Sequence, residues 1–350
     1  MMFKLNRKSS PIPIYQQLIE QYKQAILTQQ YQPGNRIDSI NEIQSRFNVS
    51  RETAKTVLKS LSDQGLIIKK RGKGSFIANL GPKKKKWVVI VPFFSVQIEQ
   101  LIHHLRQKVQ KIGRILEYFV DYNNWQEEIR LVGTMINERY EAVIVIPTFD
   151  ESKTASFYKR LQTAGTVVTL LDHTMVGSSF PYVIQSYDLG VRRGMQYLMD
   201  RCRGSIAFVK NNTWLGRNMV QEVMEDTYIN SLKSDSACSK PLVIEDVNSI
   251  TQEKLKRKKI TGFFCCEDTD AVRILGRLNE WGVKLNDHVA IVSYGNTDLA
   301  RFFTPAITSI DPHYEEMATI SAEIIQKYTH GIDVTSSQHV LQPDLIIRAT

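Results

Sequence analysis

Basic side chains and glycines in the first 80 residues have the spacing that a polyanion-binding surface requires. Arg51 and Lys55 stand four residues apart, so they share one face of the helix that the surrounding apolar spacing predicts. The N-terminus of such a helix also presents unpaired backbone amides to a phosphate. Basic residues are interleaved with glycines over 69–74, which allows close approach to a phosphate backbone or a minor groove. These residues predict contacts with DNA, and a solvated helix face is the alternative.

The apolar spacing around these residues predicts three short helices followed by a hairpin. Apolar residues recur at helical intervals over 14–26. Ser39 and Glu42 have the spacing of a capping box for a second helix, and Ser50 is expected to cap the third. Two short strands then flank the glycine-containing turn at 71–74. This order of elements predicts a winged helix-turn-helix, in which the third helix contacts DNA.

Charge is distributed unevenly along the 350 residues. Residues 1–86 contain 17 basic and 5 acidic side chains, a net charge of +12, and the remainder contains 28 basic and 31 acidic side chains, a net charge of −3. A DNA-binding head attached to a separate ligand-binding or catalytic body would produce this pattern. We therefore expect a DNA-binding domain at 1–80, a basic linker at 81–86 and a body at 87–350.

Motifs at 13–18, 49–55 and 72–76 follow one another in this head. They resemble the GntR family of bacterial transcription regulators, and the similarity covers residues 11–78. Asn41 stands where the family has a DNA-contacting arginine, so a different operator sequence is expected. The resemblance and the spacing together predict a set of DNA-binding residues in the two helix starts and the hairpin turn. These are Ser39, Asn41, Ser50, Arg51, Thr53, Lys55, Arg71, Gly72, Lys73 and Gly74.

Strand-like apolar runs alternate with amphipathic helical segments through the body. Runs at 87–91, 205–209 and 289–292 are examples, and 188–200 is one of the helical segments between them. This alternation predicts an α/β fold with parallel sheets, and the length of the body suits two lobes that share a cleft. Ligands in such folds bind beyond the carboxyl ends of the strands.

Motifs at 167–172, 187–190, 266–271 and 289–296 resemble the effector domain of the LacI family, which is similar to periplasmic sugar-binding proteins. The resemblance implies a two-lobed body of the periplasmic-binding-protein type. It also implies four ligand-facing positions, which are Asp172, Arg217, Glu267 and Gly295 in this chain. Glu267 replaces an asparagine of the family and Gly295 replaces an aspartate, so either Asn296 beside it or a water is expected to take the place of the missing side chain.

These residue types suit a polyol as the ligand. A guanidinium can bridge adjacent hydroxyl groups, and carboxylates accept hydrogen bonds from them. Aromatic residues near the strand ends, among them Phe93, could stack on the apolar face of a sugar, although packing in the core is the alternative for each. The candidate effector-binding residues are Phe94, Ser95, Asp172, Trp214, Arg217, Glu267 and Asn296.

The sequence lacks several motifs of enzymes and of cofactor-binding or metal-binding proteins. We find no nucleophile elbow, phosphate-binding loop, dinucleotide fingerprint or zinc-protease motif, and the seven histidines do not cluster at ligand spacing. The four cysteines form no CxxC pair, so we interpret them as reduced packing residues. No catalytic residue, metal site or cofactor is therefore predicted.

Composition is typical of a globular protein, with 42% hydrophobic and 23% charged residues. The longest apolar run, at 87–94, is well short of the roughly 20 residues that span a bilayer. Residues 1–10 lack the apolar core of a secretory signal. We therefore expect a cytoplasmic protein with no membrane partner.

Our leading hypothesis is a transcription regulator that binds operator DNA as a homodimer. A small-molecule effector, expected to be a sugar or sugar derivative, would shift the balance between two dimer arrangements. The resemblance implies repression as the usual outcome. One alternative treats the body as a ligand-free dimerisation platform, because Glu267 and Gly295 depart from the family pattern. Another treats it as an α/β enzyme with a DNA-binding appendage.

Overall fold

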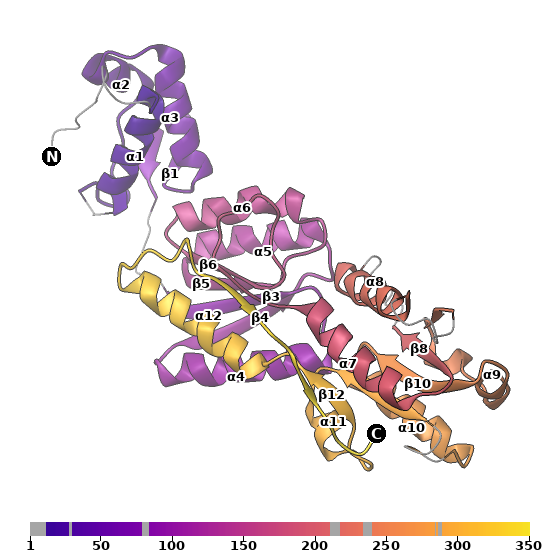
Figure 1. Ribbon diagram of the computed structural model, residues 1–350. Coiled ribbons are helices and arrows are strands. Elements are labelled where there is room, and N and C mark those ends of the chain that lie inside the picture. The colour runs from indigo at the N-terminus through magenta and orange to yellow at the C-terminus, as the bar shows by residue number, and fades with distance from the viewer. Residues whose placement is uncertain are drawn as a thin grey trace.

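A small head and a body of two lobes are visible in the computed structural model (Figure 1). The structure describes residues 12–27, 30–78, 84–210, 218–233, 240–283, 285 and 289–350. The head carries three helices and one hairpin, in the order that the sequence predicts. Its elements are α1 (Ile14–Leu27), α2 (Ile40–Phe47), α3 (Arg51–Asp63), β1 (Ile67–Lys70) and β2 (Gly74–Ile77).

The predicted helix caps of the head are confirmed. The Ser39 hydroxyl accepts a hydrogen bond from the backbone N–H of Glu42 at 3.3 Å, and the Glu42 carboxylate accepts one from the Ser39 N–H at 2.5 Å. Ser50 caps α3 by accepting from the N–H of Thr53 at 3.1 Å. Each cap satisfies backbone donors that the first turn of a helix leaves unpaired.

The head has its own small hydrophobic core. Leu18 and Tyr22 of α1 lie in one fully buried cluster with Val57 and Leu61 of α3. The Tyr22 hydroxyl lies at the edge of this core and donates a 2.5 Å hydrogen bond to the Asp38 carboxylate, so the polar group of the tyrosine has a partner. The exposed face of α3 is therefore free of any packing role within the head.

The N-lobe is built on a parallel sheet with the strand order β13-β7-β6-β5-β3-β4. Helices α4 and α12 cover one face of this sheet, and α5 and α6 cover the other. The strands are β3 (Lys84–Val91), β4 (Ile115–Val120), β5 (Tyr140–Val145), β6 (Val167–Asp172), β7 (Tyr182–Gln185) and β13 (Gln338–Leu341). The helices are α4 (Val96–Lys111), α5 (Trp125–Glu138), α6 (Glu151–Thr163) and α12 (Tyr314–Thr329).

The C-lobe sheet has the order β14-β12-β11-β10-β8-β9, and only its edge strand β14 is antiparallel. Helices α7 and α8 pack on one face, and α9, α10 and α11 pack on the other. The strands are β8 (Ser205–Val209), β9 (Leu242–Ile244), β10 (Ile260–Cys265), β11 (Ala290–Tyr294), β12 (Thr308–Asp311) and β14 (Asp344–Ile346). The helices are α7 (Tyr187–Arg201), α8 (Met219–Lys233), α9 (Gln252–Arg257), α10 (Asp268–Glu280) and α11 (Asp298–Phe302), with a short 3₁₀ turn, η1, at Val247–Ser249.

The chain passes between the lobes three times, from β7 to α7, from β12 to α12 and from β13 to β14. The last passage runs through residues 338–346, which form two strands, one at the edge of each sheet, with Pro343 between them. Proline has no N–H for a strand ladder, so it separates the two pairings. The three connections form the hinge of the body.

The first strand of the body begins earlier than predicted. β3 starts at Lys84, so residues 84–86 of the expected linker belong to the N-lobe sheet, and residues 81–83 lie outside the described residues. Lys86 pairs with Ile115 in the register of β3 and β4, and its ammonium forms an ion pair with Glu117. This partner allows a basic side chain to stand within a strand.

The end of α3 contacts the N-lobe. Arg160 of α6 donates a 2.8 Å hydrogen bond from Nε to the backbone carbonyl of Asp63. Gly65, which has a positive φ of 68°, lies so close to α5 that a Cβ there would be 3.4 Å from the side chain of Ile136. The last turn of α3 therefore rests on the helices that cover one face of the N-lobe.

Replacing Gly194 of α7 with alanine is expected to lower the free energy of unfolding by about 1–3 kcal/mol. A Cβ there would lie 2.6 Å from Phe264 and 3.0 Å from Val292 of the C-lobe sheet. Denaturant unfolding measures the change. Gly276→Ala in α10 is the matched control, because its Cβ would meet no heavy atom within 4 Å, and it should stabilise by about 0.5–1 kcal/mol. Equal effects of the two substitutions would contradict the close packing of α7.

Candidate functional site

The N-terminal turns of α3 expose the basic residues that the sequence predicts to contact DNA. Arg51 and Lys55 are both exposed, and Lys55 forms only a surface ion pair with Glu52 at 3.2 Å. Such a pair contributes little to stability and can be exchanged for a phosphate. The hydroxyls of Ser50 and Thr53 lie 2.9 Å apart at the same helix end, where they cap the helix.

The remaining predicted DNA-binding residues lie at the start of α2 and at the tip of the hairpin. Ser39 is occupied by its capping box, and Asn41 is exposed in the first turn of α2. The hairpin tip consists of Arg71, Gly72 and Lys73, all exposed, and is followed by Gly74. The glycines have φ angles of 72° and 102°, which L side chains rarely adopt. The tip is therefore a narrow basic loop in which the glycines adopt the unusual backbone conformations and Arg71 and Lys73 carry the charge.

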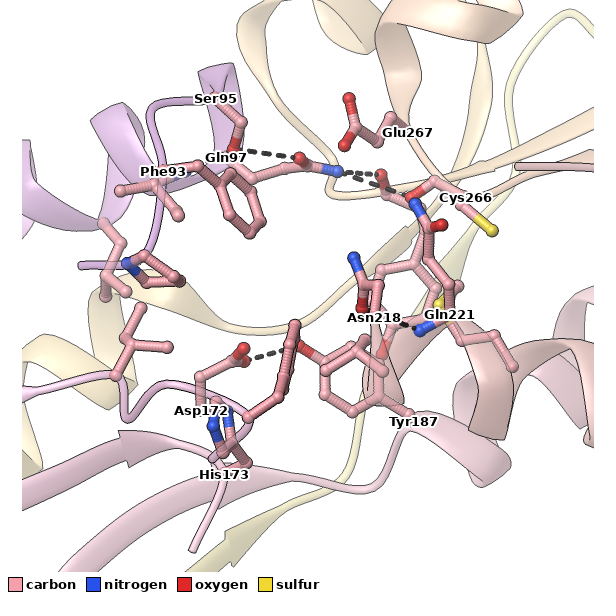
Figure 2. Close-up of a pocket in the computed structure, with 18 of the residues that line it drawn as sticks. Phe93, Ser95, Gln97, Asp172, His173, Tyr187, Asn218, Gln221, Cys266 and Glu267 are labelled. Carbon is pink, nitrogen blue, oxygen red and sulfur yellow. Dashed lines mark hydrogen bonds between the residues drawn. The ribbon is translucent and has the colours of Figure 1, made fainter. Parts of the chain in front are cut away.

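A polar cavity lies between the two lobes, beyond the carboxyl ends of several strands (Figure 2). Its volume is about 90 Å³, several times the roughly 10–15 Å³ that one water molecule requires. Polar side chains from both lobes line it together with aromatic rings. The polar and aromatic lining residues described are Phe93, Ser95, Gln97, Phe149, Asp172, His173, Tyr187, Asn218, Gln221, Glu267, Tyr294 and Tyr314.

Asp172 connects this cavity to the hinge. Its Oδ1 accepts hydrogen bonds from the Tyr187 hydroxyl at 2.5 Å and from the Gln185 amide at 3.0 Å. Gln185 in turn accepts a 2.7 Å hydrogen bond from the Tyr294 hydroxyl, whose ring stacks on Tyr187. Burial raises the pKa of both tyrosines, so they remain protonated donors. Within the described residues the Asp172 Oδ2 accepts no hydrogen bond, which leaves it for a ligand donor.

Glu267 faces the cavity from the C-lobe at the start of α10. Burial, together with the negative charges of Asp270 and Asp268, raises its pKa to about 7. Among the described residues its carboxyl group has no hydrogen-bond partner. It can therefore accept a hydrogen bond from a hydroxyl group when ionised or donate one when protonated.

His173 was not among the predicted site residues, although it follows Asp172 directly. Its ring stacks on Phe149 with the centroids 5.6 Å apart, and its two nitrogens are buried without a hydrogen-bond partner of good geometry among the described residues. Burial lowers the pKa of His173, so the ring is neutral and offers one donor and one acceptor. A buried, unpartnered ring nitrogen in a cavity wall indicates a ligand contact.

Two predicted effector-binding residues lie outside the cavity. Phe94 is half exposed and packs on Tyr118, with the ring centroids 5.4 Å apart, whereas Phe93 lines the cavity. The chain bends at Phe93, so spacing in the sequence does not decide which of the two neighbouring rings faces the cavity. Asn296 is also buried elsewhere, because its amide donates to Asp311 at 2.8 Å and accepts from Arg348 at 2.5 Å.

The other predicted effector residues divide into two groups. Ser95, Asp172 and Glu267 all line the cavity. Trp214 and Arg217 lie outside the described residues. The structure adds amide side chains that the sequence analysis missed, notably Gln97 from α4 and Gln221 from α8. Isolated glutamines carry no motif, so only the fold brings them to the cavity.

Two buried carboxyl groups lie behind the cavity wall. Glu128 accepts a 2.6 Å hydrogen bond from the Tyr158 hydroxyl, and Asp121 accepts one of 2.8 Å from the backbone N–H of Asn123. The Asn123 side chain then accepts a 3.0 Å hydrogen bond from the N–H of Phe149, which belongs to the wall. Burial and the nearby charge of Glu128 raise the pKa of Asp121 to about 8.

Comparisons with known proteins match the two parts of the chain separately. Residues 14–77 match the bacterial regulatory proteins of the gntR family, and residues 217–350 match the periplasmic binding protein-like domain. An arabinose metabolism transcriptional repressor of Geobacillus stearothermophilus is 23% identical over 97% of this chain and 98% of its own length. A repressor of the same description from Halalkalibacterium halodurans is 22% identical over 87% of this chain and 86% of its own length.

A solved structure shows the same fold in the body. The periplasmic binding protein/LacI transcriptional regulator of Alkaliphilus metalliredigens, complexed with D-xylulofuranose, has a TM-score of 0.63 and is 16% identical. The match covers 76% of this chain and 99% of that one.

Head and body together define the class of this protein as a DNA-binding regulator with a small-molecule effector domain. The chain carries a GntR-family winged helix-turn-helix domain at 14–77 and a periplasmic binding protein-like domain at 217–350. Both of these relatives are described as transcriptional repressors. Within the described residues, no helix is long and apolar enough to cross a membrane.

The free energy of unfolding is expected to fall as the pH rises from 3.8 to about 8, by up to ~1.4 kcal/mol per pH unit. Asp121 titrates near 3.8 when unfolded and near 8 when folded, so in this window the folded state holds a proton that the unfolded chain has lost. Denaturant unfolding at successive pH values measures the slope. Asp121→Asn should flatten it, whereas Asp150→Asn at an exposed position should not. A slope unchanged in D121N would contradict this assignment.

Proposed function

We propose that the cavity binds a neutral sugar and that sugar binding controls the attachment of the head to operator DNA. The observation that carries this proposal is the pair of carboxyl groups, Asp172 and Glu267, which face one polar cavity from opposite lobes. Carboxylates accept hydrogen bonds from the several hydroxyl groups of a sugar. The charged side chains among the described lining residues, Asp172 and Glu267, are both acidic, so we infer a neutral ligand rather than a phosphate or an acid.

The comparisons favour a pentose as the first candidate. Two full-length relatives are described as repressors of arabinose metabolism, and a protein of similar fold was solved with D-xylulofuranose, which is also a pentose. Phe93 and Phe149 supply aromatic surface in the cavity, and such rings can pack on the apolar face of a sugar. We therefore propose L-arabinose as the first compound to test.

Thermal unfolding should show the effector directly. A sugar at 100 times its Kd is expected to raise the free energy of unfolding by about 2.7 kcal/mol. The panel contains L-arabinose, D-xylose, D-glucose and glucose 6-phosphate, and calorimetry confirms each hit. Asp172→Asn replaces the carboxylate oxygen that is open to the ligand with an amide donor, so it should weaken binding about tenfold. Stabilisation by the sugar phosphate alone would contradict a neutral ligand.

Sequence discrimination on DNA should depend on the start of α3. Arg51→Ala is expected to cost about 1–3 kcal/mol of discrimination between a specific and a random duplex, because it removes a side chain within reach of base edges. Fluorescence anisotropy at fixed salt measures this, with a duplex selected by the wild-type protein from a random library. Arg257→Ala removes the same charge from an exposed site on α9 and is the control. Equal losses in the two variants would contradict a reading role for α3.

We further propose a cytoplasmic homodimer that acts as a repressor. The edge strand β4 and the neighbouring start of α4 expose Ile115, Tyr118, Phe94 and Val96, which is an apolar surface suited to a second copy. A dimer would place two heads on a two-fold symmetric operator. Repression follows the description of the relatives, whose effector sign we transfer to this chain as a proposal.

A second candidate function has the same DNA-binding head but a body that binds no effector. It is favoured by one observation, which is that Gln97 of the N-lobe bonds directly to backbone carbonyls of the C-lobe, so protein contacts alone can fix the two lobes. A wild-type protein that no sugar of the panel stabilises would favour this dimerisation platform.

A further inference from the structure

One side chain of the N-lobe reaches across the cavity to the C-lobe. The Gln97 amide, on the first turn of α4, donates hydrogen bonds to the backbone carbonyl of Tyr294 at 3.0 Å and to that of Cys266 at 3.5 Å. These carbonyls follow β11 and β10 of the C-lobe sheet. The Ser95 hydroxyl donates to the Gln97 side-chain oxygen at 3.3 Å and so helps to orient the amide. Figure 2 shows this chain of contacts along one side of the cavity.

A glycine provides the space that this side chain occupies. A Cβ at Gly295 would lie 2.9 Å from Cγ of Gln97, 3.1 Å from its Nε2 and 3.2 Å from a carboxylate oxygen of Asp268. Real Cβ atoms essentially never approach closer than 3.0 Å, so any other residue at 295 would displace Gln97. Gly295 also has a φ of 132°, a conformation that L side chains rarely adopt. The contact between the lobes thus depends on the absence of a side chain at 295.

Gln97 and Gly295 fit together. The family resemblance predicts the loss of a ligand-facing side chain at Gly295, yet the space at this position is filled by the Gln97 carboxamide from the opposite lobe. The bonds of Gln97 are made to backbone carbonyls, which are present whether or not a ligand is bound. They lie across the cavity from the hinge contacts of Asp172 with Tyr187 (Figure 2). Both sides of the cavity are therefore bridged.

We propose that Gln97 and Gly295 form an interlobe clasp that stabilises the closed arrangement of the two lobes. A closed body presents Asp172 and Glu267 to the ligand in their final geometry. Apparent affinity for the effector scales with the population of the binding-competent state. The clasp therefore raises this affinity by raising the population of the closed conformation. Gln97 is in this sense a positioning residue.

The clasp is tested first without any ligand. Small-angle X-ray scattering of the full chain compares wild type, Gln97→Ala and the control Gln107→Ala, an exposed glutamine on the same helix. The radius of gyration is expected to increase in Q97A and to stay at the wild-type value in Q107A. Equal radii in all three proteins would overturn the proposal.

A double-mutant cycle separates the clasp from general damage. The fall in Tm caused by Gly295→Ala should be several degrees larger in the wild-type background than in the Q97A background, because the clash with Gln97 is then absent. The backbone strain at 295 is common to both backgrounds and cancels. Additive falls in Tm would show that the two positions are independent and would overturn the clasp.

Ligand binding supplies a third readout, and this one rests on the proposed function. Loss of one net hydrogen bond corresponds to about a fivefold change in equilibrium, so Q97A should bind L-arabinose about fivefold more weakly and release it faster. Wild-type affinity and release rate in Q97A would contradict the clasp. If wild type does not bind L-arabinose, the pentose proposal fails, and scattering and the cycle still decide on the clasp.

Discussion

The hydrogen bonds that Asp172 accepts at the first crossing between the lobes set the geometry of the whole body. Its donors, Gln185 and Tyr187, flank that crossing, because one ends β7 and the other begins α7. The carboxylate that faces the cavity is therefore bonded to the hinge itself. Any ligand that engages Asp172 acts on the residues about which the lobes would turn. A two-lobed sensor needs such a link, since an effector shifts an equilibrium only through different contacts in its two states.

Polar contacts bridge both sides of the cavity, but they differ in kind. At the hinge, side chains bond to side chains, and Tyr294 extends the network through Gln185. On the other side, the Gln97 amide reaches the C-lobe through backbone carbonyls, one of which belongs to Tyr294. The end of β11 thus takes part in both bridges. This strand end carries the sequence that departs from the family pattern at Gly295, which indicates that the departure changes how the lobes are joined.

Local signals in the sequence predicted helices and strands. They did not predict which residues distant in the sequence come together in the fold. The caps at Ser39 and Ser50 are correct because a hydroxyl and the amides it satisfies lie within three residues. The strands of the body followed from apolar runs buried on both faces. The site was predicted in part. Asp172 follows a recognisable strand, whereas Gln97 reaches partners that are 169 and 197 residues away in sequence. The choice of Phe94 failed by one residue, because apolar character does not reveal the side to which a side chain points.

The contacts between the head and the N-lobe affect how a rotation of the lobes would be passed to the head. Arg160 and Ile136 contact Asp63 and Gly65 at the end of α3 from two different helices, so a rotation of the N-lobe would act directly on α3. The head stands beyond the N-lobe on the side away from the C-lobe (Figure 1). A small rotation at the hinge would therefore produce a larger displacement of the head, because the head lies far from the hinge. In a dimer, the rotation would change the distance between the two heads, and each distance would fit a different spacing of half-sites on the DNA.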